Sequence, residues 1–203
     1  AGAQANYPPA GELLAQEGPR LLHKYLIDMA GVEFDRATPG QLAYGREASH
    51  STDRILHVGD ATGRAIEEHL IQAVRAQGNL SLLTGHTAVD LITPSHHSRN
   101  PRDVYTPLSC IGAYVYDRAS GQVRRILARK TILATGGLGQ IFLHTTNPRG
   151  ARGDGLAMAY WAGARIVNAE YVQFHPTAFY HRDASRFLIS EAVRGEGGRL
   201  VDA

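Results

Sequence analysis

The sequence predicts an α/β protein with a mostly parallel sheet and an antiparallel insertion. Three observations support this prediction: two segments with helical hydrophobic spacing, two alternating runs joined by a tight turn, and an apolar run that ends in a glycine-rich turn. Helices, a meander and a glycine-ended strand in this order are typical of sheets whose parallel strands are linked by helices. With 203 residues and 43% hydrophobic content, the chain is long and apolar enough to bury a sizeable core.

Two helices are expected in the first part of the chain. Over residues 10–35, apolar side chains recur at helical spacing, and Gly31 is the expected stop. A second helix is expected from Thr62 to Gln77. Its buried face would carry Ile66, Leu70 and Val74.

Beyond the second helix, the sequence indicates short strands followed by a polar loop. Strands are expected at residues 80–83 and 87–92, where apolar residues gather in short runs. Residues 93–103 are rich in Pro, His and Asn, and we expect them to form a variable and mobile loop.

The antiparallel insertion is expected next. Residues 111–116 and 122–127 alternate on either side of Ala119-Ser-Gly, which is typical of a β-hairpin. A strand at residues 130–133 then leads into a glycine turn, and a further strand is expected to begin at Arg165.

The glycine turn Ala134-Thr-Gly-Gly is the most informative segment of the chain. Glycine has no Cβ, so another molecule can come close to the backbone of this turn. A second segment, Gly153-Asp-Gly, opens a helix expected to reach about Gly163, and the free N–H groups of a helix N-terminus suit phosphate. The two segments indicate a bound nucleotide-type cofactor. By itself, Gly137-Leu-Gly139 is a weak match to G-x-G-x-x-G because the third glycine is absent.

Composition argues against several classes of function. A net charge of +2 is too small to favour nucleic acid or a membrane surface as a partner, and no run approaches the roughly 20 apolar residues of a membrane span. A single cysteine fits a reducing compartment, and the histidines lack metal-ligand spacing. We expect Trp161 to pack in the core, and His96 and His97 to lie on a loop surface.

Two polar clusters near the end of the chain are candidates for chemistry. His175 precedes a proline, which favours extended backbone, so it would project from a strand end either as a structural histidine or as a donor to a carboxylate. Glu191 and Arg194 are three residues apart and would be neighbours on a helical turn. They form either a solvated ion pair or a proton-transfer pair beside a buried acceptor.

Seven segments in one order resemble a known family. They are Arg46-Glu-Ala-Ser-His-Ser with Arg54-Ile-Leu-His, Asp60-Ala-Thr-Gly-Arg, Leu133-Ala-Thr-Gly-Gly, Thr145-Thr-Asn-Pro, Gly153-Asp-Gly-Leu-Ala-Met-Ala, Gln173-Phe-His-Pro-Thr-Ala and Glu191-Ala-Val-Arg-Gly-Glu-Gly. Together they are similar to the flavoprotein family of succinate dehydrogenase, fumarate reductase and L-aspartate oxidase, most closely to the aspartate oxidases. The resemblance covers nearly the whole chain from about Leu21.

The resemblance implies FAD as cofactor and a set of site residues. The cofactor would be held by Thr87, Ala88, Ala134, Thr135, Gly136, Gly137 and Asp154. Substrate would be bound by Glu47, Gln173, His175 and Ser190, with Glu191 and Arg194 as the catalytic pair and no metal. Glu47 would face the α-ammonium group of the substrate, because a carboxylate separates an amino acid from succinate. Read without its flanking motif, Glu47 is an exposed loop charge. Ser190 stands where the family more often has threonine.

The activity implied is the oxidation of L-aspartate to iminosuccinate, with oxygen or fumarate as electron acceptor, in the first step of NAD biosynthesis. The resemblance also implies a cytoplasmic protein, a small-molecule substrate, and quinolinate synthase as a pathway partner. Residues 1–167 would be the FAD-binding domain, Rossmann-like and without its N-terminal glycine fingerprint, and residues 168–203 the start of a substrate capping domain. The family's catalytic arginine and second substrate histidine would lie beyond Ala203.

Two alternatives remain open at this stage. One is a succinate dehydrogenase or fumarate reductase flavoprotein subunit, which Glu47 argues against because a second negative charge would repel succinate. The other is an inactive truncated fragment. We expect the 203-residue piece to be inactive by itself and to aggregate or bind FAD weakly, because a sheet that lacks its first strand exposes an unpaired edge.

Overall fold

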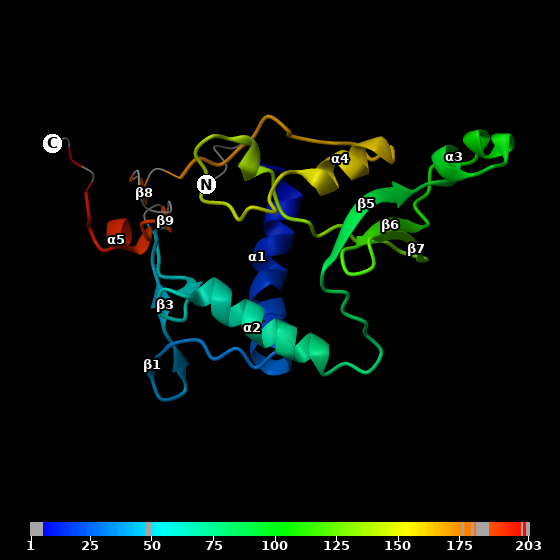
Figure 1. Ribbon diagram of the computed structural model, residues 1–203. Coiled ribbons are helices and arrows are strands. Elements are labelled where there is room, and N and C mark those ends of the chain that lie inside the picture. The colour runs from blue at the N-terminus through cyan, green and yellow to red at the C-terminus, as the bar shows by residue number, and fades with distance from the viewer. Residues whose placement is uncertain are drawn as a thin grey trace. The chain divides into compact units, whose positions relative to one another are not determined.

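The computed structural model describes residues 6–47, 50–175, 177–179, 181, 187–199 and 201. The chain divides into two compact units. Unit 1 comprises residues 1–82 and 189–203, and unit 2 comprises residues 83–188. Figure 1 labels the elements of both.

Unit 1 begins with one long helical segment, as the hydrophobic spacing predicts. Helix α1 spans Pro8–Leu22 and continues as the π-helical segment η1 over His23–Met29. Gly31 has a left-handed φ of 72° and its N–H donates to the Ile27 carbonyl at 3.1 Å, so the predicted stop is confirmed.

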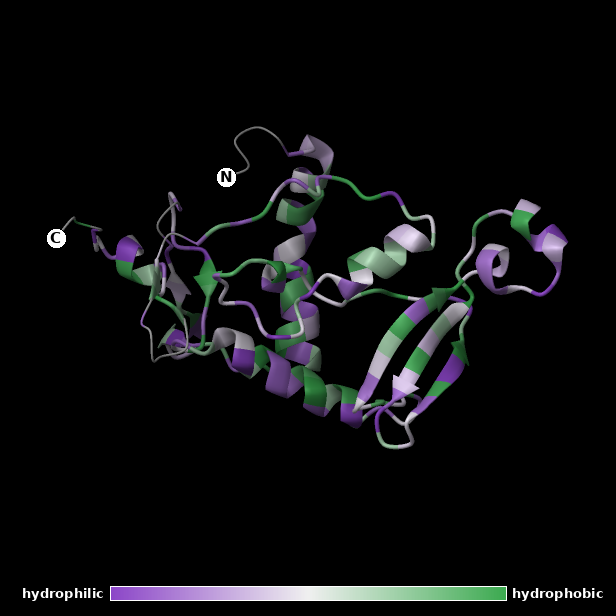
Figure 2. Ribbon diagram, turned by 45° about the horizontal axis from the view of Figure 1, so that its top comes forward, coloured by the Kyte–Doolittle hydropathy of each residue, from purple (hydrophilic) through white to green (hydrophobic). Residues whose placement is uncertain are grey.

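The second helix of unit 1 is also confirmed. Helix α2 spans Thr62–Arg75, two residues shorter than predicted, and contacts η1. On its predicted buried face, Ile66 and Val74 are half-buried, whereas Leu70 is exposed. Figure 2 shows that α1 and α2 carry both hydrophobic and hydrophilic residues, whereas α4 is mainly hydrophobic or neutral.

Two small antiparallel sheets lie between these helices in the sequence. Strand β1 (Arg36–Thr38) pairs with β2 (Gln41–Leu42), and β3 (Tyr44–Gly45) pairs with β4 (Ile55–Leu56). The β3–β4 pair forms a hairpin whose connection carries Glu47.

Asp35 ties the segment after β4 to the segment before β1. Its carboxylate accepts from the Gly59 N–H at 2.8 Å and lies 2.9 Å from His57 Nδ1. The Gly59 hydrogen bond, followed by the bond and charge of His57, holds the pKa of Asp35 below its usual value, although desolvation works in the opposite direction. The ionised carboxylate therefore stabilises this part of unit 1.

Unit 2 contains a three-stranded antiparallel sheet in the order β5–β6–β7. Strand β5 spans His86–Ile92, β6 spans Gly112–Asp117 and β7 spans Gln122–Leu127. The predicted hairpin is thus confirmed, with Asp117 opposite Gln122 at the turn.

Asp117 explains why the turn of this hairpin is well defined. Its carboxylate accepts from Ser120 Oγ at 2.7 Å and from the Ala119 N–H at 3.0 Å. Led by the Ser120 bond, these contacts lower the pKa of Asp117 against the effect of its burial.

Short elements complete the two units. Unit 2 also contains α3 (Pro94–His97), the 3₁₀ segments η2 (Pro101–Tyr105) and η3 (Gly139–Ile141), helix α4 (Asp154–Trp161), and the strand pair β8 (Ala178–Phe179) and β9 (Phe187–Leu188). Helix α5 (Ala192–Gly195) belongs to unit 1. The expectation that residues 93–103 form a plain loop was wrong, because two prolines begin short helical turns there.

The mostly parallel sheet is not found among the described residues, where every strand pair is antiparallel. Residues 80–83, 130–133 and 165–168, predicted as strands, lie outside the strands of the structure. A strand needs a neighbour that accepts and donates its backbone hydrogen bonds, and these segments have no ladder partner in the described part of the chain. Ile132 is 88% exposed as a result.

The buried apolar core is small in each unit. Val32 and Phe34 are buried in unit 1, and Leu91, Ile92, Ala151 and Met158 are buried in unit 2. Many large apolar side chains are exposed. Within the described residues, no helix is long and apolar enough to cross a membrane.

Candidate functional site

The glycine turn of unit 2 packs directly against the N-terminus of α4. A Cβ placed on Gly155 would lie 2.8 Å from Thr135 Cβ and 2.9 Å from Thr135 Cγ2, and closer still to Thr135 Oγ1. Gly153, which caps α4, has a left-handed φ of 81° and lies against Leu138. These glycines therefore let the turn and the helix N-terminus touch.

The turn also leaves open space beside its backbone. Gly136 has a left-handed φ of 75°, and no atom lies within 4 Å of the position that a Cβ would occupy. Gly137 has only Asn147 Oδ1 at that limit, 4.0 Å away. An exposed backbone without side chains is what a closely approaching phosphate or ribose requires, so the residues present fit a dinucleotide cofactor.

The other predicted cofactor residues also lie in unit 2. Thr87 and Ala88 are on β5, opposite Tyr116 and Val115 of β6. Asp154 is the first residue of α4, and its exposed carboxylate accepts from Arg152 at 3.2 Å. Asp154 thus lies at the helix N-terminus, where its carboxylate can accept from a hydroxyl group.

Two predicted substrate residues, Gln173 and His175, belong to unit 2. Gln173 is exposed and His175 is half-buried. His175 Nδ1 lies 3.2 Å from the Thr177 N–H and 3.3 Å from Thr177 Oγ1. If Nδ1 accepts from the Thr177 N–H, Nε2 carries the proton of the neutral ring. Pro176 lies outside the described residues.

In unit 1, Glu47 follows β3 in the connection of the β3–β4 hairpin. Its carbonyl accepts from the His50 N–H at 2.9 Å, and Arg46 Nε donates to the His50 carbonyl at 3.1 Å. The Arg54 N–H donates to the Gly45 carbonyl at 3.0 Å. We call residues 46, 47 and 50 the Glu47 turn; Ala48 and Ser49 lie outside the described residues. Glu47 is half-buried, not an exposed loop charge.

Helix α5 and its N-cap residue, Glu191, provide the predicted catalytic pair. Arg194 Nη2 lies 2.5 Å from Glu191 Oε1, and the two side chains are 25% and 27% exposed. The sequence prediction that they are neighbours is confirmed. Arg194 Nε is buried and has no hydrogen-bond partner in the part of the chain that the structure describes. Ser190 precedes the helix, and its Oγ accepts from the Ala192 N–H at 3.3 Å.

The Glu47 turn and α5 touch each other within unit 1. A Cβ on Gly195 would lie 3.1 Å from the carbonyl carbon of Arg46 and 3.6 Å from that of Glu47. The structure therefore brings the backbone of Glu47 to the helix that Glu191 caps and that carries Arg194, although about 140 residues separate them in sequence. The remaining predicted residues, those of the cofactor set with Gln173 and His175, lie in unit 2.

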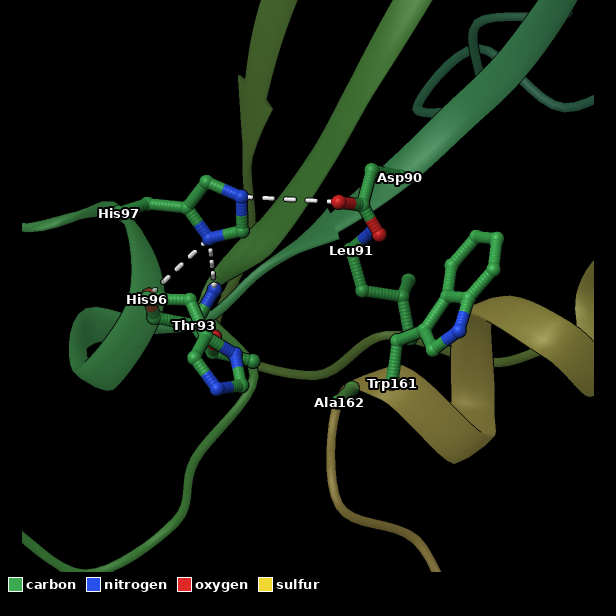
Figure 3. Close-up of a pocket in the computed structure, with 7 residues that line it drawn as sticks. All are labelled: Asp90, Leu91, Thr93, His96, His97, Trp161 and Ala162. Atoms are coloured by element: carbon green, nitrogen blue, oxygen red, sulfur yellow. Dashed lines mark hydrogen bonds and ion pairs between the residues drawn. The ribbon is translucent and has the colours of Figure 1, made fainter.

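A pocket in unit 2 was not predicted from the sequence. It has a volume of about 340 Å³ and is lined by the end of β5, by α3 and by the end of α4. Figure 3 shows contacts from His97 to both Asp90 and Thr93, and it shows Trp161 across the pocket from His96 and His97. His97 Nε2 lies 3.6 Å from Asp90 Oδ2, and its Nδ1 lies 3.2 Å from the backbone nitrogen of Thr93.

The pocket corrects one expectation. Trp161 is 61% exposed and lines the pocket, so the expectation of core packing was wrong. His96 and His97 line it too; His96 is exposed and His97 is half-buried, and both bond to Thr93, which is buried. The signal available in the sequence was Thr93-Pro, since Pro at the first position of a helix turns the following histidines back toward the strand end. Among the described residues, the search for three or more possible metal ligands that lie together found none.

Comparison with known proteins assigns the class. The sequence profile of the FAD binding domain family matches residues 1–203. The chain belongs to this family: it has a FAD-binding flavoprotein fold of mixed helices and strands, and its cofactor is FAD.

Individual relatives indicate a more specific group. L-aspartate oxidase 1 of Ralstonia nicotianae is 48% identical over 173 residues, which cover 84% of this chain and 31% of that protein. L-aspartate oxidase of Pseudomonas aeruginosa is 48% identical over 156 residues, which cover 76% of this chain and 28% of that protein. The chain thus spans about a third of the length of these relatives, and the resemblance to the aspartate oxidases is confirmed over most of it.

Solved structures show the same fold. The Mycobacterium smegmatis Sdh1 complex in the apo form is 30% identical and superposes with a TM-score of 0.74, covering 95% of this chain and 32% of that chain. The likeness supports the succinate dehydrogenase and fumarate reductase flavoprotein family as the wider group to which this chain is related.

Proposed function

We propose that this chain is part of an FAD-dependent L-aspartate oxidase, which converts L-aspartate to iminosuccinate with oxygen or fumarate as electron acceptor. This would be the first step of NAD biosynthesis. The observation that carries the proposal is the contact of the Glu47 turn with α5, because it brings the backbone of a half-buried glutamate to the helix that follows Glu191 and carries Arg194. The identities of 48% to named L-aspartate oxidases support the same activity.

The chain's own residues would hold the cofactor through two glycine segments. Ala134, Thr135, Gly136 and Gly137 would lie against its phosphate and ribose region, and Asp154 would hydrogen-bond near its flavin side. Thr87 and Ala88 would lie against the adenosine half. When bound, FAD supplies the two-electron acceptor for the hydride that leaves the substrate α-carbon.

Recognition of aspartate would depend on charge. Glu47 would face the α-ammonium group, the feature that distinguishes aspartate from succinate. Gln173, His175 and Ser190 would hold a substrate carboxylate, with His175 donating from Nε2, since Nδ1 faces Thr177. The substrate would thereby be oriented for reaction.

Glu191 and Arg194 would handle a proton next to the substrate. Their 2.5 Å contact and half-buried positions support a proton-transfer pair over a fully solvated ion pair. The buried Arg194 Nε, without a partner in the described residues, leaves a donor available for a further acceptor.

The same proposal includes the sheet, the domain boundaries and the place where the protein acts. The segment at residues 130–133 would be a strand of a mostly parallel Rossmann-like sheet, and Thr131 Oγ1, buried and without a partner in the described part of the chain, is consistent with a missing neighbour. Residues 1–167 would form the FAD-binding domain and residues 168–203 the start of the capping domain. The protein would act in the cytoplasm, with quinolinate synthase as a pathway partner.

A second candidate is a succinate dehydrogenase or fumarate reductase flavoprotein subunit. The likeness to the Sdh1 complex favours it, with a TM-score of 0.74. Glu47 argues against it, since a carboxylate at the substrate would repel a dianion.

The test measures peroxide production by the full-length gene product that contains this chain, with L-aspartate and with succinate as substrates. We expect peroxide with aspartate only. In Glu47→Gln, kcat/KM for aspartate should fall about 30-fold, since a hydrogen bond between charged groups contributes roughly 2 kcal/mol. Glu33→Gln, an exposed glutamate in unit 1, is the matched control and should behave as wild type.

Dye-linked succinate oxidation without aspartate-dependent peroxide would instead support the second candidate. Unchanged discrimination between aspartate and succinate in Glu47→Gln would show that Glu47 does not select the substrate. The 203-residue chain can also be purified by itself. Its flavin absorbance after gel filtration measures whether it binds FAD.

A further inference from the structure

We infer that Gly195 is a positioning residue for substrate selection: by lacking a side chain, it lets the Glu47 turn lie against α5. The inference rests on the proposed function, because it concerns how Glu47 is held at that site. Gly195 itself would not touch the substrate.

The contact leaves no room for a side chain at position 195. A Cβ there would lie 3.1 Å from the Arg46 carbonyl carbon and closer still to the Arg46 carbonyl oxygen. Both are backbone atoms, which cannot rotate away as the end of a flexible side chain can. Gly195 ends a helix and has no left-handed φ, so its close approach to the turn, and not its backbone conformation, requires glycine.

On the other side of the contact, hydrogen bonds hold the Glu47 turn in one conformation. Arg46 Nε donates to the His50 carbonyl, the His50 N–H donates to the Glu47 carbonyl, and β3 pairs with β4 at the base of the hairpin. Pushing the Arg46 carbonyl away from α5 would therefore displace Glu47 together with it. The displacement would change where the Glu47 carboxylate lies.

The helix side of the contact carries the rest of the unit 1 residues. The Gly195 N–H donates to the Glu191 carbonyl at 3.0 Å, and the Glu191 carboxylate forms an ion pair with Arg194. Gly195 thus links the carboxylate proposed to select the ammonium group to the pair proposed to move a proton. Because a misplacement of about 1 Å can change a rate about 100-fold, this contact sets how well the two sets act on one substrate.

The test compares Gly195→Ala with Gly63→Ala in the full-length gene product, loaded with FAD. Gly63 is also a helical glycine, but no atom lies within 4 Å of its Cβ position. We expect Gly195→Ala to raise KM for aspartate and to lower the preference for aspartate over succinate by about 10-fold or more. Flavin content should stay at the level of Gly63→Ala.

A double variant distinguishes positioning from general damage. If Gly195 acts through Glu47, then Gly195→Ala should change the preference little in a Glu47→Gln background. A full additional loss there would overturn the inference. Unchanged preference and KM in Gly195→Ala alone would also overturn it.

Arg46→Ala keeps the test decisive if Gly195→Ala does not fold. The Arg46 side chain is largely exposed, and its removal loosens the Glu47 turn without adding atoms at α5. It should lower the preference for aspartate in the same direction, and an unchanged preference would count against the inference. If the wild-type protein oxidises succinate and not aspartate, the proposed function fails and the inference with it. If the wild type selects aspartate and both variants do so equally well, only the inference fails.

Discussion

Thr135 occupies the space directly above Gly155. A Cβ on Gly155 would lie 2.8 Å from Thr135 Cβ and 2.9 Å from Thr135 Cγ2, so the glycine turn and the first turn of α4 are in direct contact. The two segments that the sequence singles out as a cofactor cradle therefore hold each other in place.

A side chain at position 155 should separate the two segments. We expect Gly155→Ala to lower the free energy of unfolding by about 1–3 kcal/mol, the usual result of overpacking, and to lower the FAD content of purified protein. Urea unfolding and flavin absorbance measure the two effects. Gly150→Ala is the control, since no atom lies within 4 Å of its Cβ position. Thr135→Gly should restore part of the stability of Gly155→Ala, and a complete lack of restoration would contradict the proposed contact.

Acid should loosen unit 1 through Asp35. The Gly59 N–H and His57 lower the pKa of Asp35 from its usual 3.8, so its stabilisation is fully present above that value and is lost as pH falls through the lower pKa of the folded protein. We expect Asp35→Asn to be less stable than wild type at neutral pH, and the difference to shrink between about pH 5 and about pH 2. Circular dichroism across this range measures it. Asp28→Asn, at an exposed position, should leave the pH profile unchanged. A difference that grows as pH falls would contradict the assignment.

The two interpretations of Glu191 and Arg194 predict different kinetics. If the two residues are a proton-transfer pair, Glu191→Gln should lower kcat about 10²–10⁴-fold while FAD stays bound and KM changes little. If they are a simple ion pair, Glu191→Gln should leave kcat within a few-fold of wild type. The pair Glu17 and Arg20 on α1 has the same spacing but is more exposed, so Glu17→Gln is a matched control. Steady-state kinetics and a pH–rate profile decide between the two interpretations.

Elements that depend on local sequence were predictable. The β6–β7 hairpin follows from alternation and from turn residues that Asp117 binds within a few positions. Helices α1, α2 and α4 follow from hydrophobic spacing, and Gly31 and Gly163 follow the helical segments that end before them. In each case the determining contacts lie within one or two turns of chain.

Elements that depend on distant partners were not predictable. The segment at residues 130–133 has strand composition, but a strand exists only with a neighbour, and composition does not name one. The pocket beside Trp161 forms where β5, α3 and α4 end close together, which no local pattern encodes. The contact between Gly195 and the Arg46 carbonyl joins residues about 150 positions apart, and no local pattern predicts it.

The division of the chain has a consequence for how it is made. Unit 1 takes residues from both ends of the sequence, so the hairpin with Glu47 leaves the ribosome well before the helix that packs against it. At about 5–20 residues per second, translating residues 83–188 takes roughly 5–20 s. During this time the contact between the Arg46 carbonyl and Gly195 cannot form. Closing so long a loop is also entropically unfavourable. The Glu47 turn would thus reach its final position against α5 only after residues 83–188 have been synthesised.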